Sequence, residues 1–331
     1  MMNKTKLSVA GPMVFGVERS SRCAGLRRGF LRGALRGAVV VSLVVMAGCN
    51  LGEANFVGTK TMKVMPPGGG ATGDGFSAEA TVEATAGESK TLSRADLMPG
   101  VNAGVFDISS GNGAITVEPS TDGVLSVMAE IKATTQERLD ACVLSVVPGS
   151  GGGLTIRVVW PDGVAYMQEG ASITVKAPVR SGLTLETSNG AIAATAVTGT
   201  VKARTSNGRI MIQNVGGDVS VRTSNGAVTI GGAVAAVAAK TSNGAVVVTM
   251  GDNAIGPCNI TTSNGAVKLS IGPGMSGSAT ISTGNGGITL SGRAFEKQTV
   301  NKSSASIEFG AAGGPASSIR TSNGGIEVIL R

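Results

Sequence analysis

The chain of 331 residues contains 51 glycines and no histidine, and only 3% of its residues are aromatic. Because histidine is the commonest general base and metal ligand, its absence excludes Ser-His-Asp and Cys-His catalysis and histidine metal sites. The net charge of +7 comes almost entirely from residues 1–48, which carry eight Lys or Arg and one acid; the remainder is formally neutral, so we expect no nucleic-acid partner.

Residues 1–48 have the features of an export signal peptide. Arg27 and Arg28 precede an apolar run at 37–48 that is too short to span a bilayer and ends in small residues before Cys49. The sequence Met-Ala-Gly-Cys at 46–49 resembles a bacterial lipobox, which implies that Cys49 is diacylated and becomes the first residue of the mature protein. The surroundings of Arg27 and Arg28 are similar to the twin-arginine export motif and also fit an ordinary Sec signal. We therefore expect an extracytoplasmic protein of the bacterial envelope, periplasmic or at the cell surface, anchored to a membrane by lipid.

A tether and a strand-rich section follow the signal. Residues 49–75 include a Pro-Pro-Gly-Gly-Gly run and little apolar periodicity, which is typical of a flexible tether. Residues 76–182 form the predicted N-terminal strand-rich section, starting with an alternation of apolar and polar residues over 76–85. A short helix is expected at 134–141, capped by Thr134 or Thr135. Further strands are expected at 105–108, 114–117, 125–133, 142–147, 154–160 and 173–177.

The section also contains the only Trp and Tyr of the chain, Trp160 and Tyr166. Such a pair beside a turn either closes the end of a core or stacks on a sugar.

Residues 183–331 are organised by a repeated Thr-Ser-Asn-Gly sequence. Six copies and one variant with Gly in place of Ser are separated, from Asn to Asn, by 18, 18, 18, 21, 21 and 38 residues. The last interval divides into two of 19 if Ser304 and Ala305 belong to a degenerate copy. A period of about 20 residues predicts a solenoid. The Asn-Gly pairs are Asn189 and Gly190, Asn207 and Gly208, Asn225 and Gly226, Asn243 and Gly244, Asn264 and Gly265, Asn285 and Gly286, and Asn323 and Gly324.

Aligning the copies on Asn shows apolar columns on both sides of the corner. The position three residues after Asn is always Ile or Val, so we expect an all-β protein whose parallel β-solenoid has about eight coils. An antiparallel meander of Asn-Gly hairpins is the alternative, although a meander gives no reason for columns to repeat. Since Asn tolerates the left-handed backbone region and Gly adopts it readily, we expect the corner to be a backbone requirement. Cys258 falls in a column otherwise filled mostly by Val, which favours a buried thiol over a disulfide with Cys142.

The repeats resemble a known family. The Ala-Pro pair at 177–178, the segment Leu-Thr-Leu-Glu-Thr-Ser-Asn-Gly at 183–190 and the later copies are similar to the bacterial putative-adhesin family of β-strand-repeat proteins, over roughly residues 77–331. The resemblance implies the fold and an adhesin label without an established activity. This chain has Ala after the corner Gly where relatives often carry Asp, so a carboxylate-based role does not carry over. The four alanines are Ala191, Ala227, Ala245 and Ala266.

One surface feature suggests a ligand. Arg204, Arg222 and Lys240 occupy the same outward position in three successive coils, with Glu186 before them and Arg320 later in the chain. Cations about 4.8 Å apart fit a linear polyanion such as an acidic polysaccharide. The alternative is a solvated face whose cations prevent pairing with another chain.

Catalytic chemistry is sparse in the repeats. Only six acids lie between 183 and 331, and no two occupy neighbouring coils as a pair. We therefore expect no catalytic residues, no cofactor and no metal, and interpret the chain as a non-catalytic surface or envelope binding module for an acidic polysaccharide or another envelope component. A structural envelope protein without a ligand and a divergent polysaccharide-active β-helix enzyme are the alternatives. The acids are Glu186, Asp218, Asp252, Glu296, Glu308 and Glu327.

Overall fold

The computed structural model describes strand residues 4–8, 14–18, 82–84 and 89–94, and residues 104–331 except 122, 178–181 and 312. The chain divides into two compact units, residues 1–44 and 45–331. In the first unit, β1 (Lys4–Ser8) and β2 (Val14–Glu18) form an antiparallel pair. The predictions for Arg27, Arg28, Cys49 and the tether lie outside the described residues. No helix in the described part of the chain has the length and apolar character needed to cross a membrane.

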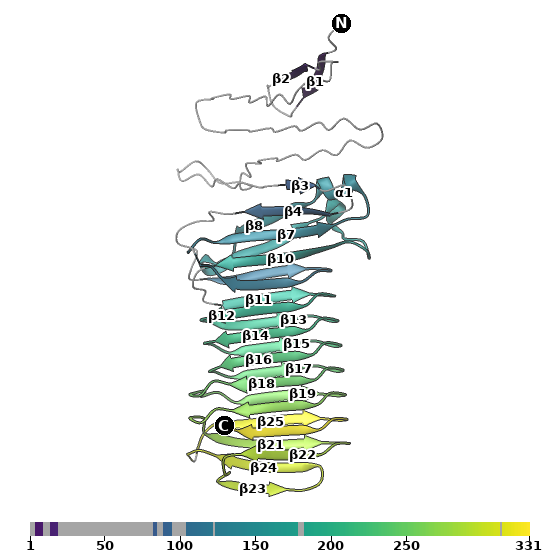
Figure 1. The fold of residues 1–331 in the computed structure, drawn as a ribbon. Helices are drawn as coiled ribbons and strands as arrows, with labels where there is room; N and C mark the ends of the chain where they lie inside the picture. The colour runs from purple at the N-terminus through teal and green to yellow at the C-terminus, as the bar shows by residue number, and fades with distance from the viewer. Residues whose placement is uncertain are drawn as a thin grey trace, which may run out of the picture. The chain divides into compact units, whose positions relative to one another are not determined.

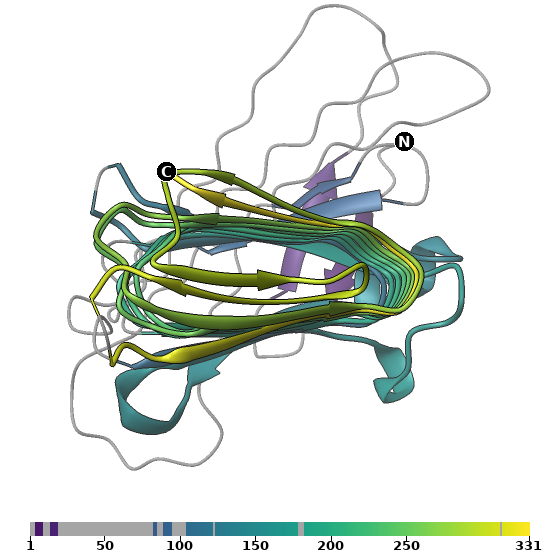
Figure 2. The same cartoon turned by 90° about the horizontal axis from the view of Figure 1, so that it is seen from below.

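The second unit contains two twelve-stranded sheets that face each other across one core (Figures 1 and 2). Sheet 1 contains, in spatial order, β22 (Ile288–Gly292), β26 (Ile326–Leu330), β20 (Val267–Ile271), β18 (Val246–Met250), β16 (Val228–Ala233), β14 (Ile210–Val215), β12 (Ile192–Val197), β6 (Ile115–Pro119), β10 (Gly170–Ala177), β7 (Ser126–Lys132), β4 (Ser89–Arg94) and β3 (Val82–Ala84). Sheet 2 contains β23 (Lys297–Val300), β24 (Ser304–Phe309), β21 (Gly277–Thr283), β25 (Ala316–Thr321), β19 (Cys258–Thr262), β17 (Val237–Lys240), β15 (Val219–Arg222), β13 (Thr200–Arg204), β11 (Gly182–Thr187), β5 (Val105–Ser110), β9 (Leu154–Val159) and β8 (Val143–Pro148).

Each repeat forms one coil of a parallel β-solenoid. A strand of sheet 2 leads through the Thr-Ser-Asn-Gly corner into a strand of sheet 1, and both strands pair in parallel with the neighbouring coil. The segment 105–119 forms a coil of the same kind, from the two strands expected at 105–108 and 114–117. The solenoid prediction is therefore confirmed, and the meander alternative is wrong for the repeat coils.

The inward columns stack in register and form the core. Ile192 pairs with Ile210, and Ile210 pairs with Val228, all fully buried. On sheet 2, Val237 pairs with Cys258, so Cys258 occupies the valine column as predicted and is buried as a free thiol. Complete burial of such an aliphatic side chain stabilises the fold by about 1.5–3 kcal/mol. The coils on either side provide this burial.

The last repeat of the sequence does not lie last in the solenoid. β25 pairs on one side with β19 and on the other with β21, while β26 pairs with β20 and β22 (Figure 1). The coil at 316–330 therefore lies between two coils that precede it in the sequence. The coils at this end do not stack in sequence order, since identical columns let a coil stack on any other.

The predicted degenerate copy at Ser304 and Ala305 is also wrong. β24 runs antiparallel to β21, and β23 runs antiparallel to β24, so this segment is a hairpin that extends sheet 2. Ile307 and Phe309 are fully buried from the hairpin, whereas Val300 is exposed. The apolar residues of this hairpin belong to an end cap. They match the repeat columns because side chains in an antiparallel strand alternate with the same period of two.

The other end has a related arrangement. β9 and β10 stack in parallel on β5 and β6, and the antiparallel strands β7 and β8 lie beyond them. Helix α1 (Gln136–Ala141) connects β7 to β8, and its cap is Thr135, whose Oγ1 accepts a hydrogen bond from Arg138 N at 3.3 Å. The predicted helix is thus confirmed. The strands of 104–177 extend the same two sheets as the repeats.

Candidate ligand-binding face

The corner glycines are required for close approach and not for a left-handed backbone. None of the seven Asn-Gly pairs has a positive φ, so the left-handed explanation is wrong. A Cβ on Gly226 would lie 1.7 Å from Gly208 O in the coil before it, and the other corner glycines are similarly tight. In three successive repeat coils a left-handed residue lies at the opposite corner: Ala196, Asn214 and Gly232 have φ of 56°, 55° and 67°.

Two hydrogen-bond ladders run through the corners. Each corner Asn donates from Nδ2 to the Asn Oδ1 of the neighbouring coil, as in Asn225 to Asn207 at 2.7 Å. Each buried corner Thr donates from Oγ1 to a Gly carbonyl of the neighbouring coil, as in Thr223 to Gly208 at 3.0 Å. The first ladder connects, in spatial order, Asn112, Asn189, Asn207, Asn225, Asn243, Asn264, Asn323 and Asn285. The Asn and Thr side chains of the repeated motif therefore bind neighbouring coils, and we look for a ligand on the flat faces of the sheets.

The predicted basic residues form a row on the outer face of sheet 2. Arg204 pairs in register with Arg222, and Arg222 pairs with Lys240, so the three side chains lie on adjacent strands. Arg204 and Glu186 approach to 3.9 Å, with both side chains more than 60% exposed. Within the described residues, Arg222 and Lys240 have no ion pair. We name Arg204, Arg222, Lys240 and Arg320 the basic row.

Arg320 joins the basic row through the inserted coil. Lys240 pairs with Thr261, and Thr261 pairs with Arg320, so four cations occupy five adjacent strands spanning about 19 Å. If the coils stacked in sequence order, β25 would lie on the far side of β21, and Ser282 would separate Arg320 from Thr261. In the structure β25 lies between β19 and β21, so Arg320 is directly beside Thr261. Lys202, on β13 beside Arg204, adds a further exposed cation to this face. The repeat intervals could not show the position of Arg320, because they do not reveal where the last coil stacks.

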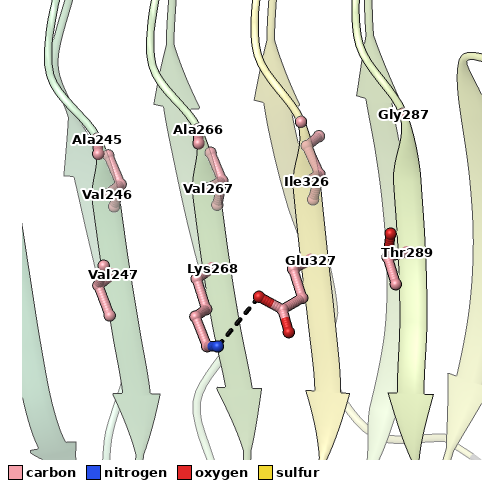
Figure 3. A pocket seen from close by; sticks show the side chains of 11 residues that line it. Ala245, Val246, Val247, Ala266, Val267, Lys268, Gly287, Thr289, Ile326 and Glu327 are labelled. Carbon is pink, nitrogen blue, oxygen red and sulfur yellow. Dashed lines mark ion pairs between the residues drawn. The ribbon is translucent and has the colours of Figure 1, made fainter.

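The outer face of sheet 1 has a different character. A shallow groove of about 490 Å³ crosses β18, β20, β26 and β22, and its floor is made by small residues beside the corners (Figure 3). Lys268 and Glu327 form an ion pair of 3.0 Å across the groove. This face therefore presents no uncompensated charge at the groove. The small residues of the floor are Ala245, Ala266, Gly287 and Gly325.

The acids of the repeats lie apart and mostly have partners. Glu308 pairs with Lys297 at 3.2 Å, and Asp252 pairs with Arg331 at 3.1 Å. Asp218 accepts a hydrogen bond from Ala236 N at 3.1 Å. Among the described residues, no group of three or more His, Cys, Asp and Glu is placed to hold a metal ion.

Glu169 forms a buried polar cluster near α1. Its carboxylate accepts hydrogen bonds from Arg138 Nε at 2.7 Å and Arg138 Nη2 at 2.9 Å, and further bonds from Thr134 and Tyr166 N. The bonds from Arg138 hold the pKa of Glu169 far below its ordinary value, outweighing the opposing effect of burial. The Arg138 guanidinium lies 3.7 Å from the centre of the Tyr166 ring. One face of Tyr166 is therefore covered by a cation, while Trp160 packs against the core.

The buried thiol of Cys258 is chemically inert. Burial raises the pKa of Cys258 to about 12, so the thiolate that would react is not populated near neutral pH. Cys142 is also buried, and its Sγ donates a hydrogen bond to Arg138 O at 3.2 Å.

No family model and no curated protein matches the chain. Among solved structures, it is similar to a putative cell adhesion protein from Clostridium sporogenes, at 8% identity over 73% of this chain and 100% of that one, with a TM-score of 0.34. A putative adhesin from Bacteroides fragilis matches at 14% identity over 73% and 97%, with a TM-score of 0.31. A third, from Parabacteroides distasonis, matches at 10% over 74% and 98%, with a TM-score of 0.26. These bacterial neighbours carry the adhesin description that the repeat resemblance implies.

Proposed function

We propose that this chain is a lipid-anchored, extracytoplasmic binding module of adhesin type that holds a linear acidic polysaccharide, without catalysis, along the outer face of sheet 2. The observation that carries the proposal is the basic row, four exposed cations on five adjacent strands. The basic row runs perpendicular to the strands, so a polymer bound to it would lie along the solenoid axis.

The electrostatics favour a polymer over a small anion. Two unit charges 4 Å apart in water interact by only about 1 kcal/mol, so one cation binds one carboxylate weakly. A row of cations engages successive charges of the same polymer, and each contact after the first is intramolecular. Binding through such exposed charges weakens as salt increases, because the Debye length falls from about 10 Å at 0.1 M to about 3 Å at 1 M.

The anchor rests on Cys49 and the signal sequence before it. A diacylated and N-acylated Cys49 would supply more than one chain, which stable membrane attachment requires. Mass spectrometry of the mature N-terminus tests this part: Cys49 as an acylated first residue supports the anchor, and an unmodified Cys49 contradicts it.

The polymer site is tested by substitution of the basic row. Retention of the protein on immobilised polygalacturonate is compared with that of a variant carrying Arg204→Ser, Arg222→Ser, Lys240→Ser and Arg320→Ser. A matched control replaces four exposed cations elsewhere, Lys132→Ser, Lys176→Ser, Arg209→Ser and Lys302→Ser. We expect the first variant to lose retention at low salt and the control to keep most of it.

Other outcomes distinguish the alternatives. Equal retention of both variants would contradict the basic row as the binding surface, and no retention of the unchanged protein would favour a purely structural role. Release of new reducing ends from the polymer would favour the enzyme alternative.

A further inference from the structure

We propose that the last coil, residues 316–331, is an exchangeable element, and that the slot between the β19–β20 coil and the β21–β22 coil accepts the same coil from a second copy of this chain. The partner is thus another molecule of the protein, and the contact is intermolecular stacking of one coil. This inference does not depend on the proposed polysaccharide site.

The slot is formed by segments that precede the coil in the chain. Residues 272–276, which are not a strand, connect β20 to β21. This connection passes over the width of one coil, because β25 and β26 lie between the coil of β20 and the coil of β21. Both walls are lined by the repeat columns, with Ile260 on one side of Ile319 and Ile281 on the other. A second copy offers identical columns, so the exchanged coil would bury the same side chains.

The polar ladders reach across the slot in the same way. Thr321 Oγ1 donates to Gly265 O at 2.9 Å, and Thr283 Oγ1 donates to Gly324 O at 2.8 Å. Asn323 donates to Asn264 at 2.8 Å and accepts from Asn285 at 2.8 Å. Each of these bonds joins the coil to residues outside it, so each can form equally well between two copies.

The connection to the coil has the length that exchange needs. The six residues 310–315 link β24 to β25, which lies two strand positions away across β21, about 10 Å. The six residues give seven Cα steps between Phe309 and Ala316, which reach about 23 Å when extended. Gly310 and Gly313 are exposed and have φ of 67° and 89°, so both ends of the turn lie at the surface in a backbone conformation that glycine adopts readily. It can therefore serve as a hinge for a second copy beside the first.

Cysteine pairing tests the exchange directly. Asn259 and Ser318 are register partners on the outer face of sheet 2, at a Cα separation that a disulfide can bridge. The four native cysteines are first removed by the substitutions Cys23→Ser, Cys49→Ser, Cys142→Ala and Cys258→Val. Two full-length chains are then made in this background, one with Asn259→Cys and the other with Ser318→Cys. The two chains are unfolded together, refolded at high concentration and oxidised. We expect a covalent dimer between the two chains. The control mixes Ser220→Cys with Ala238→Cys, register partners in coils that both precede the hinge, and should give no dimer.

A shortened hinge provides a second readout. Deleting residues 311–315 leaves one hinge residue, so Phe309 and Ala316 are separated by two Cα steps that extend to about 7 Å. This is less than the two strand spacings of about 10 Å that the coil must cross. We expect this variant to become a dimer in light scattering with unchanged β-sheet circular dichroism. A monomer, folded or unfolded, together with no covalent dimer above the control in the cysteine experiment, would overturn the proposal.

Discussion

At the scale of single residues, the corner glycines show how tightly the coils approach. Gly226→Ala places a methyl carbon 1.7 Å from Gly208 O, so the backbone of one coil must move. We expect a loss of about 1–3 kcal/mol in the free energy of unfolding, measured with urea. Gly287→Ala is the matched control, since nothing lies within 4 Å of its added Cβ, and should change stability by less than about 0.5 kcal/mol. Equal effects at the two positions would contradict close approach as the reason for glycine.

Glu169 makes stability depend on pH in the acid range. Its folded-state pKa is depressed below 4.5 by Arg138, so its contribution is fully present above about pH 4.5 and is lost as the pH falls toward the folded-state pKa. We expect Glu169→Gln to cost about 1.5–3 kcal/mol at pH 7, because the hydrogen bonds from Arg138 lose their charged acceptor.

The measurement is urea unfolding of both proteins between pH 7 and pH 3. The stability difference between wild type and Glu169→Gln should narrow below about pH 4.5, whereas the exposed neighbour Glu137→Gln should give a small difference throughout. A Glu169→Gln difference that stays constant across this range would show that the carboxylate is not responsible.

At the scale of elements, the asparagine ladder links coils one hydrogen bond at a time. Asn225→Ala removes two bonds, one to Asn207 and one from Asn243, whereas Asn285→Ala at the end of the ladder removes only the bond to Asn323. At about 1 kcal/mol per bond, we expect Asn225→Ala to cost roughly twice as much as Asn285→Ala in urea unfolding. Equal costs would indicate that each Asn matters for its own turn and not for the ladder.

The elements that sequence predicted well are those with a strong local pattern. The strands of the repeat follow from β-branched columns with a period of two, and the cap of α1 follows from Thr135 before a short polar helix. The strand at 304–309 shows the limit of this reasoning. Its alternation is correct, but its direction depends on pairing with β21, and a period of two is the same in parallel and antiparallel strands.

At the scale of the whole molecule, the inserted coil joins the two coils around it. Deleting residues 316–331 should remove one neighbour from β19 and β20 and one from β21 and β22, while the stack from β5 to β18 keeps all its neighbours. In limited proteolysis we expect cleavage within 277–309 and protection of the earlier coils. Unchanged protection of 277–309 would mean that β21 and β22 restack directly on β19 and β20.

The sequence by itself determined the coil: its length, its inward columns, its corner and the outward position of the basic residues. These follow from local alternation and from a repeat that no single coil could bury alone. Only the tertiary structure decided the order of the coils, and with it the place of Arg320 beside Thr261 in the basic row. It also brought Glu169 to Arg138, 31 residues apart in the chain. The reason is that every coil presents the same columns, so stacking energy alone does not distinguish one neighbour from another; the end hairpin and the lengths of the connections do.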